Sequence, residues 1–334
     1  MNRRLFLAAS VFALAGCNQS PSTETATATD TDTATETAST ATPTATVEPT
    51  PSPTDTDTPT ETAEPTETET PELSPREEQA AEAMDRAIRE LTRAVNSYAD
   101  QANGSLLDVS AASRSFTRIT VLGDISDADD HISDARPRAS ERQRARLAGI
   151  EDARQFLRIS VDVQTAVIEA YGDAQQGREA LDEEQDGGID TASGSLRDNQ
   201  RRANQRLTTL TEETAAEPVS VVPALPTSEY EAKVSQFTAE VDGFASLADF
   251  FDRLEVAVVD LNDAERFDRV ENESRARENA REAAEAFETL ETELRTFVSN
   301  LSESGASLEG LSTDLADLAA AKAEKAREIE ADNA

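Results

Sequence analysis

The sequence predicts an all-α protein: an elongated antiparallel helical bundle, or a helical-hairpin repeat, that follows a disordered stalk. Apolar residues recur at steps of three and four through most of residues 76–331, which is the period of an amphipathic helix. Short segments with Gly or Pro interrupt this period and divide the region into about seven helices. Residues 17–75, by contrast, contain almost no apolar residues from which a core could form.

The first 16 residues have the layout of a signal peptide. Arg3 and Arg4 precede twelve mostly apolar residues, Leu5 to Gly16, which end at a small-residue site. As a helix, those residues would rise only ~18 Å, whereas the hydrocarbon core of a bilayer is ~30 Å thick. We therefore expect a signal for export and no membrane-spanning helix in these residues.

The two arginines also resemble the twin-arginine export signal, in which paired arginines precede a bulky apolar pair, here Phe6 and Leu7. Asn2 stands where that signal usually has Ser or Thr, and Ala8 stands where it usually has Lys. The resemblance implies export, with the twin-arginine system as the route.

Leu14, Ala15, Gly16 and Cys17 match the lipobox of exported lipoproteins at all four positions. The resemblance implies that Cys17 receives a diacylglyceryl thioether and becomes the N-terminus after cleavage. Two acyl chains give the stable membrane anchoring that a single chain does not. The alternative is a secreted protein without lipid. Cys17 is the only cysteine, so the sequence predicts neither disulfides nor a thiolate metal site.

Residues 17–75 are predicted to be a disordered tether between Cys17 and the helices. The 58 residues from Asn18 to Pro75 include 21 Thr, 9 Pro and 12 acidic residues. Their composition resembles that of O-glycosylated stalks, and a bare polar tether is the alternative. Acceptor sequences for N-glycosylation, of the form N-x-S, occur at four positions: Asn18, Asn103, Asn272 and Asn300.

The negative charge of the chain argues against nucleic acids as partners. The sequence has 67 acidic and 31 basic residues, and its net charge is −36. Such a surface repels the phosphates of nucleic acids, and anionic lipid headgroups as well. With only three lysines among the basic residues, the composition resembles that of proteins from extreme halophiles. We expect the fold to depend on salt, since the Debye length is only ~3 Å at 1 M.

The first predicted helix starts at Ser74 and Pro75, because Pro suits the first helical position and Glu77 and Glu78 follow in the first turn. Apolar residues then form one stripe: Met84, Ile88, Leu91, Val95 and Tyr98. Residues 156–171 are apolar on several faces, and no turn residues flank them, which favours a buried central helix.

Three further stripes continue to the end of the domain. The first takes more than seven turns, from Val234 to Leu261, and the others run from Phe287 to Leu301 and from Leu308 to Leu318. Breaks are predicted at five places: Asn103-Gly104, Arg136-Pro137, Gly187-Gly188, Pro218 to Pro226, and near Ser304-Gly305. The apolar segment 219–226 is interpreted as packing across helix ends, with an exposed contact patch as the alternative.

Two segments suggest an internal duplication. Residues 197–210 and 277–290 are identical at six of 14 positions, at an offset of 80. This predicts a repeated hairpin covering about 150–215 and 230–302. Shared helical composition is the alternative explanation.

Few residues suggest chemistry. The only histidine, His131, lies in a segment with five aspartates that is interpreted as a solvated acidic turn, with a divalent cation site as the alternative: Asp124, Asp127, Asp129, Asp130 and Asp134. The stretch from Asp182 to Ser193 is similar to an EF-hand calcium loop. In that resemblance its ligands are Asp182, Glu184, Asp186 and Asp190.

The calcium loop departs from the usual pattern in two places. Glu184 is longer than the usual Asp or Asn, and Ser193 replaces the bidentate Glu that closes the loop. A plain acidic turn around Gly187 and Gly188 is therefore the main interpretation, with weak calcium binding as the alternative. No other cofactor is expected.

Together these features predict a non-enzymatic lipoprotein on the extracytoplasmic face of the cell membrane. Diacylglyceryl-Cys17 would hold it in the bilayer, and its helices would interact with another, unidentified protein of the envelope. The alternative is a lipoprotein that binds a solute or metal and delivers it to a membrane transporter. Low aromatic content, 4%, argues against that alternative, since ligand clefts usually rely on aromatic groups.

Overall fold

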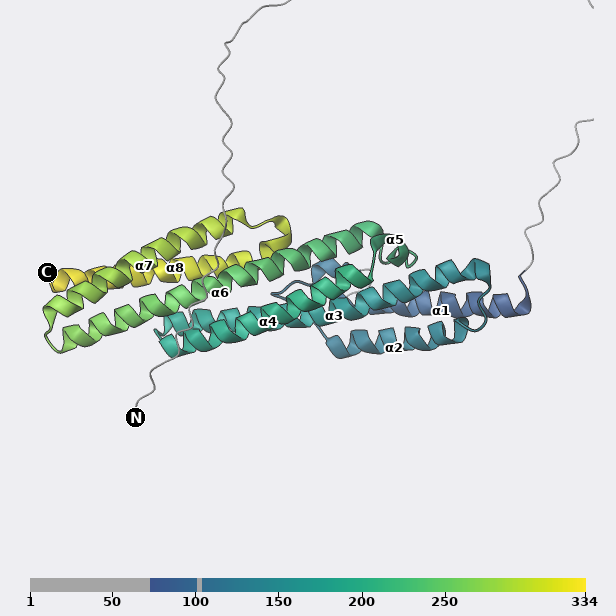
Figure 1. The fold of residues 1–334 in the computed structure, drawn as a ribbon, viewed down its shortest axis with the longest axis horizontal. Coiled ribbons are helices and arrows are strands. Elements are labelled where there is room, and N and C mark those ends of the chain that lie inside the picture. Colours follow the sequence, from purple (N-terminus) through teal and green to yellow (C-terminus); the bar gives the residue numbers. More distant parts are fainter. Residues whose placement is uncertain (1–72, 101–103) are drawn as a thin grey trace, which may run out of the picture. The chain divides into compact units, whose positions relative to one another are not determined.

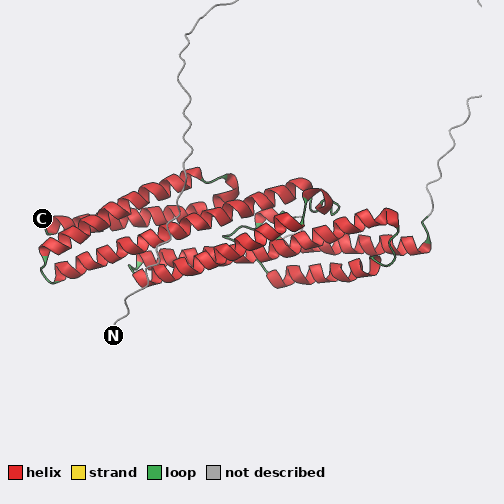
Figure 2. Ribbon diagram, in the orientation of Figure 1, coloured by secondary structure: helices red, strands yellow, loops and turns green. Residues whose placement is uncertain are grey.

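A computed structural model describes residues 73–100 and 104–334 (Figure 1). Every regular element within these ranges is helical, so the all-α prediction is confirmed (Figure 2). The predicted signal peptide and lipobox, the predicted stalk up to residue 72, and Asn18 and Asn103 lie outside the described residues, whereas Pro75, the predicted end of the stalk, is the first residue of the first helix.

The described residues form eight α-helices and two short 3-10 helices. In chain order these are α1 (Pro75–Tyr98), η1 (Leu106–Asp108), α2 (Arg118–Ala135), α3 (Glu141–Asp182), α4 (Asp186–Glu213), α5 (Ala216–Val219), α6 (Thr227–Arg269), α7 (Glu273–Asn300), η2 (Glu303–Leu308) and α8 (Glu309–Asp332). Seven of the α-helices have at least 18 residues, in agreement with the predicted number.

The helices pair as antiparallel hairpins: α1 with α2, α3 with α4, α6 with α7, and α7 with α8 (Figure 1). The two longest helices, α3 and α6, have 42 and 43 residues. At 1.5 Å per residue, each is about 63 Å long. Because α3 contacts both α2 and α4, and α6 contacts both α4 and α7, these two helices join the hairpins to one another.

The start of α1 is as predicted. Ser74 accepts a hydrogen bond from the backbone N–H of Glu77, and the Glu77 carboxylate accepts one from the backbone N–H of Ser74, at 2.8 Å. This capping box satisfies two donors that the first turn of a helix leaves without intrahelical partners. Pro75 follows at the first helical position, where its missing N–H removes no hydrogen bond.

One core of aliphatic and phenylalanine side chains draws on all seven long helices, and α3 and α6 supply many of its residues. The predicted buried helix is the middle of α3, where Phe156, Leu157, Val161 and Val163 are fully buried. The stripe of α6 is equally buried, and its largest members are Phe237, Phe244 and Phe251. The segment 219–226 packs inward at Val219, Val222 and Leu225, which confirms the interpretation that it packs across helix ends.

One predicted break is wrong in position. Gly187 and Gly188 lie in the first turn of α4, and the turn between α3 and α4 is residues 183–185. A backbone in the left-handed region makes this turn possible, with φ of 58° at Glu184. Glu271, in the turn between α6 and α7, has φ of 59°. A side chain in this conformation costs free energy, which surrounding contacts must offset.

The hairpin α3–α4 resembles the hairpin α6–α7 in its dimensions. Both α4 and α7 have 28 residues, and α7 begins and ends 87 residues after α4. The two left-handed residues, Glu184 and Glu271, have the same separation. The offset of 80 between the matching segments is two helical turns shorter, so the helix bounds support a different register, and the duplication itself stays a prediction.

Candidate functional site

Lys233, on α6, is fully buried and surrounded by oxygen atoms. Its Nζ donates to the backbone carbonyls of Leu106, at 2.9 Å, and Val109, at 2.7 Å. It also lies 2.8 Å from the side-chain oxygen of Gln164 and 2.8 Å from that of Gln236. An ammonium group has three N–H donors, so these four acceptors share them. None of the four oxygens belongs to a charged group.

Aromatic rings complete the surroundings of this ammonium group. Nζ lies 4.5 Å from the ring centroid of Phe237 and 5.2 Å from that of Tyr98, within the range of cation–π interactions. The hydroxyl of Tyr98 donates to Gln164 Oε1, at 2.8 Å, and Gln164 Nε2 donates to the carbonyl of Ser110, at 2.9 Å. Lys233 is therefore part of a buried network that joins α1, α3 and α6.

Glu240 is also fully buried on α6, two turns beyond Lys233. Its Oε1 accepts hydrogen bonds from the backbone N–H of Ala111, at 2.8 Å, and from Ser307 Oγ, at 2.9 Å. Its Oε2 is buried without a hydrogen-bond partner among the described residues. A buried polar atom in that state costs stability.

A third residue of α6 also binds the connection between α1 and α2. Glu229 Oε1 accepts from Ser105 Oγ and from the backbone N–H of Leu106, both at 2.6 Å. Glu229, Lys233 and Glu240 are spaced by four and seven residues, which places them on one face of the helix. This face supplies the partners that the irregular backbone of residues 105–111 lacks within its own segment.

Burial shifts the ionisation of both internal charges. Desolvation lowers the pKa of Lys233 from 10.5 to about 7, against the opposing attraction of Glu240 and Glu229. Desolvation likewise raises the pKa of Glu240, against hydrogen bonds from Ala111 and Ser307 and the attraction of Lys233. Such shifts are common at catalytic sites, but here the polar atoms around Lys233 belong to the fold itself.

A pocket of about 370 Å³ lies beside this network. Its lining residues are Leu107, Ala232, Gln236, Glu303 and Ser304. Gln236 connects the pocket to Lys233, since its side-chain oxygen is one of the four that surround Nζ.

The predicted calcium ligands are not gathered into a loop. Glu184 faces α8, where its carboxylate accepts hydrogen bonds from Lys322, at 2.7 Å, and from Lys325, at 2.7 and 2.8 Å. Burial alone would raise the pKa of Glu184, but these two lysines outweigh it, and the pKa lies below its ordinary value. The backbone carbonyl of Asp182 accepts from Lys322 as well, at 2.8 Å.

The other two predicted ligands lie on the helix that follows. Asp186 and Asp190 are in the first turns of α4 and face Glu255 of α6. Burial raises the pKa of Glu255, and the negative charges of Asp190, Asp252 and Asp186 raise it further. Ser193, where an EF-hand has its bidentate Glu, is buried and donates to Asp252 Oδ1, at 2.6 Å.

The segment around His131 is not the acidic turn that the sequence suggested. It forms α2, because Val121, Ile125, Ala128 and Ile132 supply a helical apolar face that packs into the core. Its five aspartates lie on the remaining faces of that helix.

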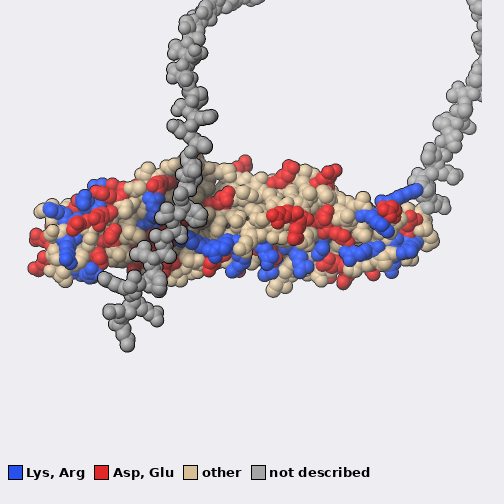
Figure 3. Space-filling model, viewed as in Figure 1, with Lys and Arg blue, Asp and Glu red and all other residues tan. Residues whose placement is uncertain are grey.

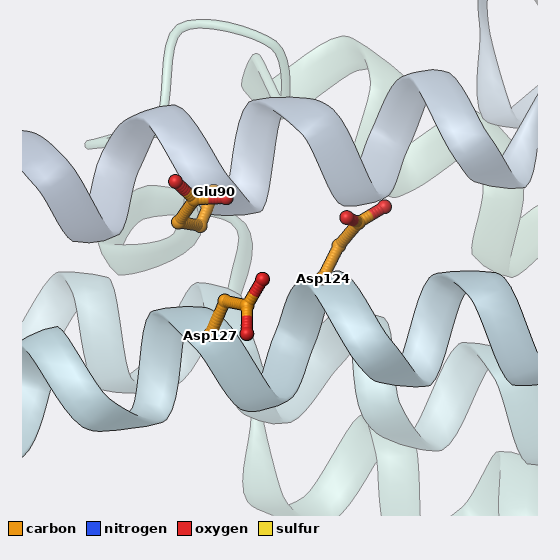
Figure 4. Close-up of side chains that lie close together, drawn as sticks. All are labelled: Glu90, Asp124 and Asp127. Atoms are coloured by element: carbon orange, nitrogen blue, oxygen red, sulfur yellow. The ribbon is translucent and has the colours of Figure 1, made fainter.

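Two of those aspartates meet a glutamate of α1. Oxygens of Glu90, Asp124 and Asp127 lie within 4.8 Å of one another (Figure 4). Arg93 forms an ion pair with Glu90 and lies 3.9 Å from Asp124 and 4.0 Å from Asp127. Asp124 also accepts a hydrogen bond from Ser97 Oγ, at 2.6 Å. The guanidinium group therefore occupies the position from which a cation would neutralise these carboxylates.

Both predicted glycosylation sites within the described residues are exposed at the ends of α7. Asn272 precedes its first residue and Asn300 is its last. Their positions leave both side chains accessible.

Comparison of the chain with protein-family models, with curated proteins and with solved structures gives no match. Within the described residues, no helix has the length and apolar character needed to cross a membrane.

Sequence reasoning missed the buried network of Lys233 and Glu240. The available signal was the position of each residue beside an apolar stripe: Lys233 precedes Val234, and Glu240 precedes Val241. The scarcity of lysine was a second signal. Of the three lysines in the chain, Lys233 and Lys322 are buried and Lys325 is half-buried in ion pairs.

Proposed function

We propose that this protein is a non-enzymatic lipoprotein on the extracytoplasmic face of the cell membrane, where its helical unit serves as an interaction or structural element of the envelope. Diacylglyceryl-Cys17 anchors it, and the segment between Cys17 and the start of α1 acts as a tether. The resemblance of residues 2–17 to an export signal followed by a lipobox supports the location. The partner is another protein of the envelope.

The observation that supports a structural role best is that the buried charged side chains bind other parts of the fold. Lys233 and Glu240 bind the backbone of residues 106–111, and Lys322 and Lys325 hold the turn at Glu184 against α8. A catalytic acid or base needs a position from which it reaches a substrate. These groups instead hold one part of the bundle against another.

Cross-linking in native membranes tests this function. The tagged protein is expressed in its own cells, cross-linked on intact cells in molar salt, and captured, and the attached proteins are identified by mass spectrometry. We expect one envelope protein to be enriched with the wild type and lost with Cys17→Ser. Equal recovery from wild type and variant, or recovery of no protein above background, contradicts the proposal.

One observation favours a second candidate, a binding protein that delivers a small solute to a transporter. The pocket of about 370 Å³ beside Gln236 combines a carboxylate, a hydroxyl, an amide and the apolar side chains of Leu107 and Ala232. A solute that stabilises the wild type against heat, but not the variant Gln236→Ala, would favour this function over the first.

A further inference from the structure

Six arginines gather at the end of the helical unit where α1 begins. One lies in the first turn of α1, and the others lie between the end of α2 and the second turn of α3: Arg76, Arg136, Arg138, Arg142, Arg144 and Arg146. We call this set the arginine end. Two contacts hold its parts together: Arg76 donates to the carbonyl of Pro137, and Gln143 Nε2 donates to that of Glu77, at 2.9 Å.

The arginine end is an exception to the charge of the chain. Residues 74–80 and 134–146 contain six basic and four acidic residues, and two further carboxylates, Glu151 and Asp85, pair with Arg136 and Arg146, so the charges at this end balance, whereas the whole of 76–334 contains 29 basic and 55 acidic residues. At the other end of the unit, residues 260–273 and 324–332 contain four basic and ten acidic residues. Figure 3 shows basic side chains in blue, beside acidic ones in red, at the surface where α1 begins, and further basic side chains along the same face. The unit is therefore close to neutral at this end and acidic at the other.

The arginine side chains are accessible. Arg136 is 63% exposed and Arg144 is 67% exposed. Four of the six arginines form an ion pair at the surface: Arg136 with Glu151, Arg138 with Asp134, Arg144 with Glu141 and Arg146 with Asp85. Exposed ion pairs of this kind contribute little to stability, so an incoming phosphate can replace the carboxylate. Guanidinium groups bind phosphate oxygens in a bidentate arrangement, which lysine does not offer.

Helix dipoles favour anions at this end. Both α1 and α3 begin here, and only α2 ends here (Figure 1). The N-terminus of a helix carries a partial positive charge and stabilises nearby anions. Two N-termini and one C-terminus therefore reinforce the arginines.

The position of the arginine end along the chain indicates its partner. Residue 73, from which the chain continues towards Cys17, adjoins the first turn of α1, whereas α8 ends near the turn between α6 and α7 (Figure 1). A coil of the intervening length spans roughly 40 Å, and an extended one reaches ~180 Å. If Cys17 is in the bilayer, the arginine end is the part of the helical unit nearest to the lipid along the chain.

We propose that the arginine end binds the anionic phosphate headgroups of the membrane in which Cys17 is anchored, so that the helical unit stands with its acidic end away from the lipid. This inference rests on the proposed lipid anchor. Repulsion between the anionic surface and the acidic end favours the same orientation. In molar salt, where the Debye length is ~3 Å, direct contacts between arginine and phosphate carry the interaction.

Vesicle sedimentation tests the proposal with a protein that lacks the covalent lipid anchor. The chain from residue 17 onward, with Cys17→Ser, keeps the compact unit of residues 69–334 and lacks the apolar leader. It is mixed with vesicles of equal parts phosphatidylglycerol and phosphatidylcholine, or of phosphatidylcholine alone, in the lowest salt that preserves the native circular dichroism. We expect binding to the anionic vesicles, and about tenfold weaker partitioning for the double variant Arg142→Gln/Arg144→Gln.

The control is a pair of exposed arginines elsewhere, Arg201→Gln/Arg202→Gln on α4, which we expect to leave partitioning within twofold of the starting protein. Equal binding to neutral vesicles, or equal losses in both double variants, overturns the proposal. Absence of vesicle binding also overturns it. A larger hydrodynamic radius of Arg142→Gln/Arg144→Gln than of the starting protein would then indicate that the arginine end binds the acidic segment 18–72 instead of lipid. The lipid anchor is tested separately in cells, so either idea can fail alone.

Discussion

Lys233 Nζ lies 2.8 Å from Gln164 Oε1 at a point where both side chains are fully buried, and this contact joins the two longest helices, α6 and α3. The same ammonium group holds the carbonyls of Leu106 and Val109. The segment between α1 and α2 is thus fixed by a charge that the core encloses, and its contribution to stability depends on pH.

Lys233→Met should lower the free energy of unfolding by about 2–4 kcal/mol at pH 10, well above the pKa of Lys233 in the folded protein, because four buried oxygens lose their shared donor. Denaturant unfolding in molar NaCl measures this. Arg201→Met, at an exposed side chain, is the control and should change stability by at most about 0.5 kcal/mol. Equal losses of unfolding free energy for the two substitutions would show that the buried network stabilises the fold no more than an exposed arginine does.

The pH dependence of that difference has a definite sign. Lys233 has a pKa of about 7 in the folded protein, well below its ordinary 10.5, so the unfolded chain binds more protons between these values. The contribution of Lys233 to stability should rise from pH 7 towards 10.5 and be lost as the pH falls through 7. Wild type should therefore show a steeper rise than Lys233→Met in unfolding experiments at pH 7–10. Parallel pH profiles would contradict the lowered pKa.

Gly149 and Gly172 form a matched pair of helical glycines on α3. A Cβ on Gly149 would lie 2.7 Å from the backbone oxygen of Pro218, whereas one on Gly172 would meet nothing within 4 Å. We expect Gly149→Ala to destabilise the protein by about 1–3 kcal/mol. Gly172→Ala should stabilise it by about 0.5–1 kcal/mol, since alanine has the higher helix propensity. Thermal unfolding distinguishes them, and a stabilising Gly149→Ala would contradict the packing of α3 against the segment at Pro218.

Calcium should give no saturable heat with the helical unit at millimolar concentration in molar NaCl. Lys322 and Lys325 already neutralise Glu184, and Asp186 and Asp190 lie in α4 instead of a loop. Calorimetric titration checks this against the weak extracellular range of about 10⁻⁴ to 10⁻³ M. A saturable signal that Asp182→Asn/Asp186→Asn abolishes would show that the turn rearranges around the ion.

Salt should be required for the fold. Residues 76–334 contain 55 acidic and 29 basic residues, which repel one another over ~10 Å at 0.1 M salt and over only ~3 Å at 1 M. We expect the helical signal in circular dichroism to fall as NaCl is reduced from molar to ~0.1 M. A signal that stays constant over this range would remove the resemblance to halophilic proteins as an explanation of the composition.

Periodicity was sufficient to predict the helices, because each long helix buries one stripe of apolar residues, and their steps of three and four are visible in the sequence itself. The start of α1 was equally clear, since Ser74 and Glu77 form a local capping box. The turn after α3 was harder: Gly187 and Gly188 suggested a break, but the chain turns at Glu184, which two lysines about 140 residues away hold in place. Contacts between distant parts of the chain decide such features.

The candidate site was beyond sequence reasoning for the same reason. The position of Lys233 beside an apolar stripe is a weak sign of burial, but the sequence does not show its partners, which come from the segment before α2 and from α3. The acidic segment at His131 illustrates the converse error. Its aspartates suggested a turn, yet four apolar residues at helical spacing outweighed them: Val121, Ile125, Ala128 and Ile132.

Lipid anchoring at Cys17 is the central claim, and membrane fractionation of Cys17→Ser tests it most directly. The thiol is required for the thioether, so the variant should leave the membrane fraction and appear in the medium, while the wild type stays with the membrane in molar salt. Intact-mass measurement of the wild type should show a diacylglyceryl group on an N-terminal cysteine. Retention of Cys17→Ser in the membrane to the same extent as the wild type would contradict the account.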